Sequence, residues 1–305
     1  MGSGSWTTDS FRSYSCTKGM RVSTDGLLSG DYSNQEMFKA ETMDPVLDPK
    51  DAVRECRDTE EHPNTIPVIL ALDVTGSMGE AAVEIAKKLN VIMTKLYDKV
   101  SDIEFMIMGI GDLECDHYPI QASQFESDIR IAEQLDKLYF EFGGGGNSYE
   151  SYTAAWYFAS RHTKLDCLKR GRKGIIITMG DEMLNPCLPK IGKYAGLAMV
   201  TGDNLQENVI NTRDLYDEVS QDFNIYHLDV HHRSRWNDEE IEKSFKRYLD
   251  DSHFRRVSID NITDEIVDII INEASINSTT EEVVSSTNIK NENKTYTSGM
   301  TEITW

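Results

Sequence analysis

Residues 68–79 read Val68-Ile-Leu-Ala-Leu-Asp73-Val-Thr75-Gly-Ser77-Met-Gly79, an apolar run that ends in one carboxylate and two hydroxyls. The run predicts a buried β-strand, and the glycines predict a tight turn directly after it. Oxygen ligands of this kind favour hard cations such as Mg²⁺, Mn²⁺ or Ca²⁺. A site with few charges leaves such an ion attractive to a carboxylate from outside, so the stretch predicts a metal site at a strand end.

Two later segments also combine apolar stretches with polar loops. Residues 142–150 read Phe-Gly-Gly-Gly-Gly-Asn-Ser-Tyr-Glu and lie between two helical patterns, and residues 174–182 read Gly-Ile-Ile-Ile-Thr-Met-Gly-Asp-Glu, a buried-strand run that ends in acid. In open α/β sheets, ligands bind outside the carboxyl ends of the strands, where neighbouring loops converge. We therefore expect Asp73, Ser148 and Asp181 to lie at one edge of a sheet.

The spacing Asp-x-Thr-x-Ser from Asp73 to Ser77 resembles the first segment of the metal-ion-dependent adhesion site (MIDAS) of von Willebrand factor A (vWA) domains. The resemblance implies three loops that hold a divalent cation at the C-terminal edge of a parallel sheet, with an open coordination position for an acidic group of a partner protein. The second loop departs from the family's pattern, which has a threonine, so Ser148 or Asn147 would supply that oxygen. The implied metal ligands are Asp73, Thr75, Ser77, Ser148 and Asp181.

Intracellular members of that family in bacteria and phages frequently act with AAA+ ATPases, as adaptors or as chelatase-type subunits. The resemblance therefore implies a metal-dependent protein-binding module whose partner offers an Asp or Glu to the ion, and it suggests an AAA+ ATPase as that partner. A structural phage virion or assembly protein is one alternative. A metal-dependent hydrolase is another, with Asp73 and Asp181 as ligands and Glu182 as the base. Because nothing in the sequence marks a nucleophile or a substrate pocket, we expect a binding protein and not an enzyme.

Short apolar strands alternate with amphipathic helices from Ile66 onward. This alternation is typical of an α/β fold with a doubly wound, mostly parallel sheet and helices on both faces. A short edge strand at 119–122 would fit the antiparallel hairpin that vWA domains usually carry. The predicted strands are 67–73, 103–110, 174–179, 223–230 and 254–259. The predicted helices are 78–98, 128–140, 150–169, 206–220, 237–250 and 261–274.

The two ends of the chain differ from the middle in composition. Residues 1–60 are polar and contain few apolar runs, which predicts an extended N-terminal arm that wraps a domain. Residues 61–275 are the predicted vWA-like domain. Residues 276–305 are again rich in Ser, Thr, Asn and Glu, and they predict a polar C-terminal tail.

The 305-residue chain is acidic, with a net charge of −21 and a pI near 4.7. Such a surface repels nucleic-acid backbones and anionic membranes, so we expect neither as a partner. The five cysteines are scattered and include no CxxC pair, which indicates neither a disulfide framework nor a cysteine zinc site. Because no basic segment followed by an apolar core opens the chain, we expect a cytoplasmic protein, or a virion protein if the chain is phage-encoded.

Several of these residues also have simpler explanations. Asp, Thr and Ser after a strand are favoured helix-capping residues, so Asp73, Thr75 and Ser77 could form only a turn. Three further acidic residues are expected in solvated loop positions, with a contribution to the rim of the metal site as the alternative. These are Asp112, Asp116 and Glu182.

Two other groups of residues admit both a structural and a functional interpretation. A zinc-type site at the end of the strand predicted at 223–230 is conceivable, although neighbouring residues of a strand alternate between its faces. Its ligands would come from His227, Asp229, His231 and His232. The aromatic residues at the start of the helix predicted at 150–169 have the spacing of a core-facing stripe. They are Tyr149, Tyr152, Trp156 and Tyr157.

Overall fold

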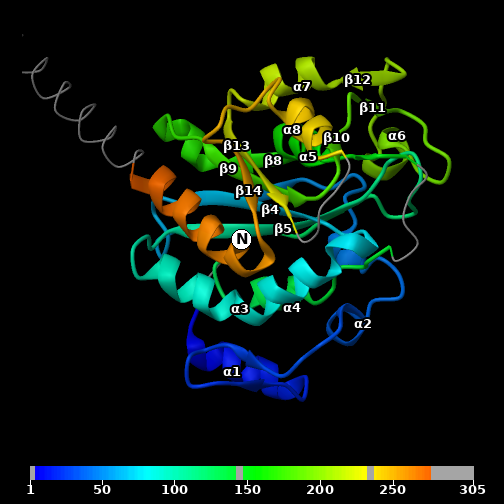
Figure 1. Ribbon diagram of the computed structural model, residues 1–305. Coiled ribbons are helices and arrows are strands. Elements are labelled where there is room, and N and C mark those ends of the chain that lie inside the picture. The colour runs from blue at the N-terminus through cyan, green and yellow to red at the C-terminus, as the bar shows by residue number, and fades with distance from the viewer. Residues whose placement is uncertain (1–3, 142–146, 232–236, 276–305) are drawn as a thin grey trace, which may run out of the picture.

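The computed structural model describes residues 4–141, 147–231 and 237–275 (Figure 1). Its centre is a six-stranded sheet in the order β14-β13-β9-β4-β5-β6. All neighbouring strands are parallel except β6, which is antiparallel to β5. The fold is therefore mixed α/β with a mostly parallel central sheet, and the predicted strands are confirmed. Their bounds are Ile66–Asp73 (β4), Ile103–Ile110 (β5), Ile120–Ala122 (β6), Gly174–Gly180 (β9), Phe223–Val230 (β13) and Phe254–Val257 (β14).

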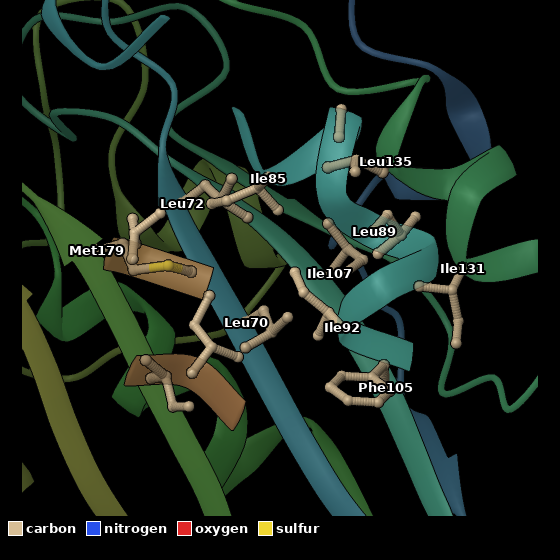
Figure 2. Close-up of a cluster of buried hydrophobic side chains, with 14 of the residues drawn as sticks. Leu70, Leu72, Ile85, Leu89, Ile92, Phe105, Ile107, Ile131, Leu135 and Met179 are labelled. Atoms are coloured by element: carbon tan, nitrogen blue, oxygen red, sulfur yellow. The ribbon is translucent and has the colours of Figure 1, made fainter. Parts of the chain in front are cut away.

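The central strand β4 explains why the core has two halves. All eight of its residues are buried between β5 and β9. Successive side chains of a strand point to opposite faces of the sheet. Leu70 and Leu72 accordingly join one hydrophobic cluster, and Ile69 and Ala71 join the other. Figure 2 shows part of the first cluster, in which Leu70, Leu72 and Met179 pack with Ile85, Leu89, Ile92, Phe105, Ile107, Ile131 and Leu135.

Helices contribute to both clusters. The first cluster includes buried residues of α3 (Gly79–Tyr97), α4 (Arg130–Leu135) and the last described helix, residues 262–275. The second includes residues of α5 (Thr153–Arg161), α7 (Thr212–Val219) and α8 (Asp238–Phe245). In Figure 1, α3 and α4 lie on one side of the sheet, and α7 and α8 lie on the other.

Two predicted helices are shorter in the structure because part of each pairs as a strand. The helix predicted at 150–169 ends at Arg161, since β8 (Thr163–Leu165) pairs with β3 (Arg54–Cys56). The helix predicted at 206–220 starts at Thr212, since β12 (Val209–Asn211) pairs with β11 (Cys187–Pro189). In both cases a partner that is distant in sequence overrides the local helical pattern.

The sequence predicts an extended N-terminal arm, but this segment contains helices and a hairpin. It contains α1 (Thr8–Thr17), the hairpin of β1 (Arg21–Val22) and β2 (Leu28–Ser29), and α2 (Asn34–Met37). A few well-spaced apolar residues of this segment join the first core cluster, which is how a polar composition still yields packed structure. They are Trp6, Phe11, Leu28, Met37, Phe38 and Leu47.

Three further features complete the description of the fold. Within residues 4–141, 147–231 and 237–275, no helix is both long and apolar enough to cross a membrane. None of the five cysteines, all of which lie in those ranges, forms a disulfide. A short helix, α6 (Leu197–Thr201), lies in the segment between β11 and β12.

Candidate metal centre

The ends of two neighbouring strands bring the first and third predicted loops together. Strands β4 and β9 are parallel, and Leu72 lies opposite Met179 in their register. Asp73 is the last residue of β4, and Asp181 directly follows β9. Both carboxylates therefore lie at the same edge of the sheet, although 107 residues separate them in sequence. Both residues are almost fully buried.

Two hydrogen-bonded pairs, Asp73 with Thr75 and Ser77 with Asp181, bring four of the five predicted site residues together. The Oδ1 of Asp73 accepts from the backbone N–H of Thr75 at 2.9 Å and from its hydroxyl at 2.6 Å. The hydroxyls of Thr75 and Ser77 are 3.3 Å apart, and the Ser77 hydroxyl donates to Oδ1 of Asp181 at 3.0 Å. The first and third loops thus meet through side-chain oxygens.

A tyrosine that the sequence analysis assigned to a core stripe also reaches this site. The hydroxyl of Tyr152 donates to Oδ2 of Asp73 at 3.0 Å and accepts from the backbone N–H of Glu182 at 3.3 Å. Its ring is fully buried, as the stripe predicts, but its polar end faces the metal-site residues. No sequence signal distinguishes it from the buried Tyr157, because the two tyrosines differ only in the carboxylate that each hydroxyl contacts, Asp73 for Tyr152 and Asp203 for Tyr157.

The electrostatics of the site suit a cation. Burial, followed by repulsion from Asp181, raises the pKa of Asp73 to about 7, although hydrogen bonds from Thr75 and Tyr152 act in the opposite direction. The nearby Glu150 is also buried, and its pKa lies well above the usual range because of burial and the charge of Asp73. A positive charge between the carboxylates would remove these costs.

The donor set is of one chemical kind. In the part of the chain that the structure describes, no group of three or more His, Cys, Asp or Glu side chains is arranged to hold a metal ion. A cation here would depend on the hydroxyls of Thr75 and Ser77 in addition to the two carboxylates. That set fits a hard ion such as Mg²⁺ better than zinc.

The second loop is described only in part. Phe142 to Gly146 of the predicted loop lie outside the described residues. Asn147 is engaged elsewhere, since its amide donates to Oδ2 of Asp112 at 2.6 Å and its carbonyl accepts from the N–H of Tyr149. Ser148 is half-buried and directly precedes β7 (Tyr149–Glu150), which pairs in parallel with β10 (Met183–Leu184) just after Asp181. This pairing makes Ser148 the better candidate of the two for the missing oxygen.

Two acidic residues near this loop differ from expectation. Asp112 and Asp116 are buried, with 4% and 3% of their surfaces exposed, and are not solvated. The carboxylate of Asp116 accepts from the N–H of Asp112 at 2.7 Å, and that of Asp112 accepts from the N–H of Glu114 at 2.9 Å. Both therefore shape the loop after β5, which the sequence alone could not indicate.

The residues considered for a zinc-type site are occupied by other contacts. The ring of His227 stacks on Phe245 with centroids 3.7 Å apart, and its Nδ1 lies 2.9 Å from the hydroxyl of Thr178. Asp229 accepts from Arg256 at 2.7 Å, and His231 lies 3.8 Å from Asp238. His232 lies outside the described residues. His227, Asp229 and His231 form no metal-binding group.

A cavity opens beside the third loop. It has a volume of about 450 Å³ and includes Tyr149 and Met183, which follow Ser148 and Asp181 closely in sequence. On its other side are residues of α8 and the turn after it, including the cationic Lys243 and Arg247. The cavity is lined by aromatic, basic and acidic side chains, and it lies next to the strands β7 and β10 that follow Ser148 and Asp181.

The chain matches no family model and no curated protein. Two structures of the pilus adhesin SpaC from Lactobacillus rhamnosus GG are similar at 12% identity over 75% of this chain, with TM-scores of 0.44 (open conformation) and 0.45. This chain spans only 31% and 32% of those two adhesin chains. The vWF domain of the type V pili tip protein Mfa5 from Porphyromonas gingivalis is similar at 11% identity over 70% of this chain and 95% of that one, with a TM-score of 0.41. At such identities no function is carried over from these proteins.

Proposed function

We propose that this protein is a metal-dependent protein-binding module of the vWA kind, with a MIDAS-type site that captures a carboxylate of a partner protein. The observation that supports this most is that Thr75 donates to Asp73 and Ser77 donates to Asp181 while the two hydroxyl oxygens lie 3.3 Å apart. This arrangement gathers four oxygen-bearing side chains from two loops. Mg²⁺ suits such donors, and Mn²⁺ or Ca²⁺ could replace it.

The roles of the residues follow from their chemistry. Asp73 and Asp181 supply charge, Thr75 and Ser77 supply neutral oxygens, and Ser148 is the donor that we propose from the second loop. When bound, the ion supplies positive charge that attracts an external carboxylate. Two carboxylates balance the charge of a divalent ion, so its attraction for a further carboxylate rests on an open coordination position. The N-terminus of α3, whose N-cap residue Met78 makes no side-chain capping hydrogen bond, adds the positive end of a helix dipole nearby.

The partner is a protein that presents an Asp or Glu, and an AAA+ ATPase is the class that the sequence resemblance suggests. The cavity beside the third loop supports protein binding, because it offers Lys243 and Arg247 to residues that flank the captured acid. The net charge of −21 works against an acidic partner at long range. We expect association to be slow at low salt and to become faster as salt screens this repulsion.

Calorimetric titration with Mg²⁺ and Mn²⁺ tests the metal site directly. The wild type should bind one ion, and Asp73→Asn should bind at least about 100-fold more weakly, because it loses a charged ligand. Asp136→Asn is a matched control, since Asp136 is partly buried and also accepts from a tyrosine, Tyr14, at 2.6 Å. Equal affinity in wild type and Asp73→Asn, with both folded, would show that the ion lies elsewhere.

Recovery of partners from the native host tests the binding role. We expect a partner that is retained with Mg²⁺ and released by chelator, and that is not retained by Asp73→Asn. A recovered ATPase would support an adaptor, whereas capsid or tail proteins would support the structural virion alternative. Full retention in chelator would contradict metal-dependent capture, and turnover of a phosphoester panel would favour the hydrolase alternative.

A further inference from the structure

The hydroxyl of Tyr152 lies between the first and the third loop of the candidate metal centre. We propose that Tyr152 is a positioning residue, which fixes the carboxylate of Asp73 for the cation and ties it to the third loop, and that Gly180 is required to make room for it. The inference rests on the proposed metal site. It assigns to the N-cap residue of α5 a task that the Asp-x-Thr-x-Ser motif does not contain.

Different groups donate hydrogen bonds to the two carboxylate oxygens of Asp73. Oδ1 accepts from Thr75, within the first loop, at 2.6 and 2.9 Å. Oδ2 accepts from Tyr152 at 3.0 Å, and the same hydroxyl accepts from the N–H of Glu182 at 3.3 Å. The carboxylate plane is therefore set by contacts on both sides. Without the tyrosine hydroxyl, only the Oδ1 side of the carboxylate would retain these contacts.

The ring of Tyr152 is itself held in place by packing. It is 0% exposed, and its centroid lies 5.0 Å from that of His227 and 5.7 Å from that of Phe245. These contacts come from β13 and α8, two elements outside the metal-site loops. A ring fixed on several sides presents its hydroxyl at one position, which is the property that orienting a ligand requires.

Gly180 shows how closely the tyrosine approaches the end of β9. A Cβ at position 180 would come within 2.5 Å of three atoms of Tyr152, namely Oη, Cζ and Cε1. Gly180 is not among the described glycines with positive φ. A glycine is therefore required at this position to leave space for Tyr152, and not to allow an unusual backbone conformation. The glycine that directly precedes Asp181 is thus explained by Tyr152.

The test compares two buried tyrosines of the same helical segment. Tyr152→Phe keeps the ring and removes the hydroxyl, and Tyr157→Phe does the same where the hydroxyl bonds to Asp203 instead. Partners that orient metal ligands typically change affinity by about 10- to 100-fold when they are lost. In calorimetric titrations with Mn²⁺ alone, we expect Tyr152→Phe to lose affinity in that range and Tyr157→Phe to keep wild-type affinity. The electron paramagnetic resonance spectrum of bound Mn²⁺ should change only in Tyr152→Phe.

A double-mutant cycle separates positioning from general stability. Tyr152→Phe should have little further effect on Mn²⁺ affinity in an Asp73→Asn background, because the carboxylate that it orients is gone. Melting temperatures in chelator serve to confirm that every variant is folded. Wild-type Mn²⁺ affinity in a folded Tyr152→Phe would overturn this inference and leave the metal site standing. Absence of Mn²⁺ and Mg²⁺ binding by the wild type would overturn both.

Discussion

The hydroxyl of Ser77 donates to Oδ1 of Asp181 at 3.0 Å, so the turn after β4 and the turn after β9 are joined directly. The Tyr152 hydroxyl also links the two loops, but the Ser77 bond joins them with no residue of another element between them. The bond also places one neutral and one charged oxygen side by side. An ion bound to both would therefore depend on the strand order that makes β4 and β9 neighbours.

Replacement of Ser77 by alanine should reduce metal affinity more than stability. The variant loses one neutral ligand and the tie to Asp181, so we expect Mg²⁺ to bind about tenfold or more weakly in calorimetry. The free energy of unfolding without metal should fall by only about 0.5–1.5 kcal/mol, the usual contribution of one hydrogen bond. Ser10→Ala, in α1, is the control for serine removal and should leave metal affinity unchanged.

The cationic side of the cavity should influence the rate of partner binding. Removing both Lys243 and Arg247 should slow association of a Mg²⁺-dependent, acidic partner peptide several-fold at low salt, with a smaller effect at high salt. Lys246→Ala is the control on the same segment, because Lys246 does not line the cavity and pairs with Glu242 and Asp251. Equal slowing by both changes, measured by stopped-flow fluorescence, would indicate a general charge effect.

Glu104 should make the protein less stable as the pH rises. It is fully buried on β5, and burial raises its pKa from 4.5 to about 7. Between those values the folded state binds more protons than the unfolded state, so the free energy of unfolding falls with pH across this range. Glu104→Gln cannot ionise, and it should be more stable than wild type at pH 8 by up to about 3 kcal/mol.

Urea unfolding at pH 5 and pH 8, in chelator, measures this difference. The exposed Glu207 provides the control, since Glu207→Gln should follow the wild type at both pH values. An identical pH dependence in wild type and Glu104→Gln would mean that the Glu104 carboxyl is stabilised in its charged form.

The N-terminal segment should contribute to the stability of the core. Trp6 is 7% exposed, and its indole N–H donates to Oδ1 of Asn90 on α3 at 3.0 Å. Trp6→Ala should lower the free energy of unfolding by about 3–5 kcal/mol, as for other buried aromatic residues. Val46→Ala, at a position 49% exposed, should change it by less than about 0.5 kcal/mol. A small effect at Trp6 in thermal melts would show that the segment is dispensable.

Removal of residues 276–305 should leave cooperative unfolding intact, because that segment is polar and offers few apolar side chains. A longer truncation that also removes residues 262–275 should abolish it, since Ile266 and Ile270 of that helix belong to the first core cluster. Calorimetric melting of both truncated chains decides the point. Loss of the transition in the shorter truncation would assign a structural role to the tail.

The strands of the central sheet could be predicted from the sequence because most of them are short apolar runs bounded by polar residues. Asp73 and Asp181 could be placed at an edge for the same reason. The shortened helices could not be predicted, because the strand at Thr163–Leu165 depends on a partner at Arg54–Cys56. Tyr152 could not be assigned to the site either, because the helical pattern predicts only that its ring is buried. The hydrogen bond from its hydroxyl to Asp73 is seen only in the structure.

The position of β4 in the sheet has a consequence for the nascent chain during its synthesis on the ribosome. Its two neighbours are β5, which follows soon after it, and β9, which starts only at Gly174. At roughly 5–20 residues per second, the ribosome needs on the order of 5–20 s to synthesise the stretch from Asp73 to Gly174. One edge of the most apolar strand therefore stays without its partner throughout that interval. An unpaired apolar edge is a template for aggregation, so a nascent chain of this protein is exposed to that risk until β9 has been synthesised.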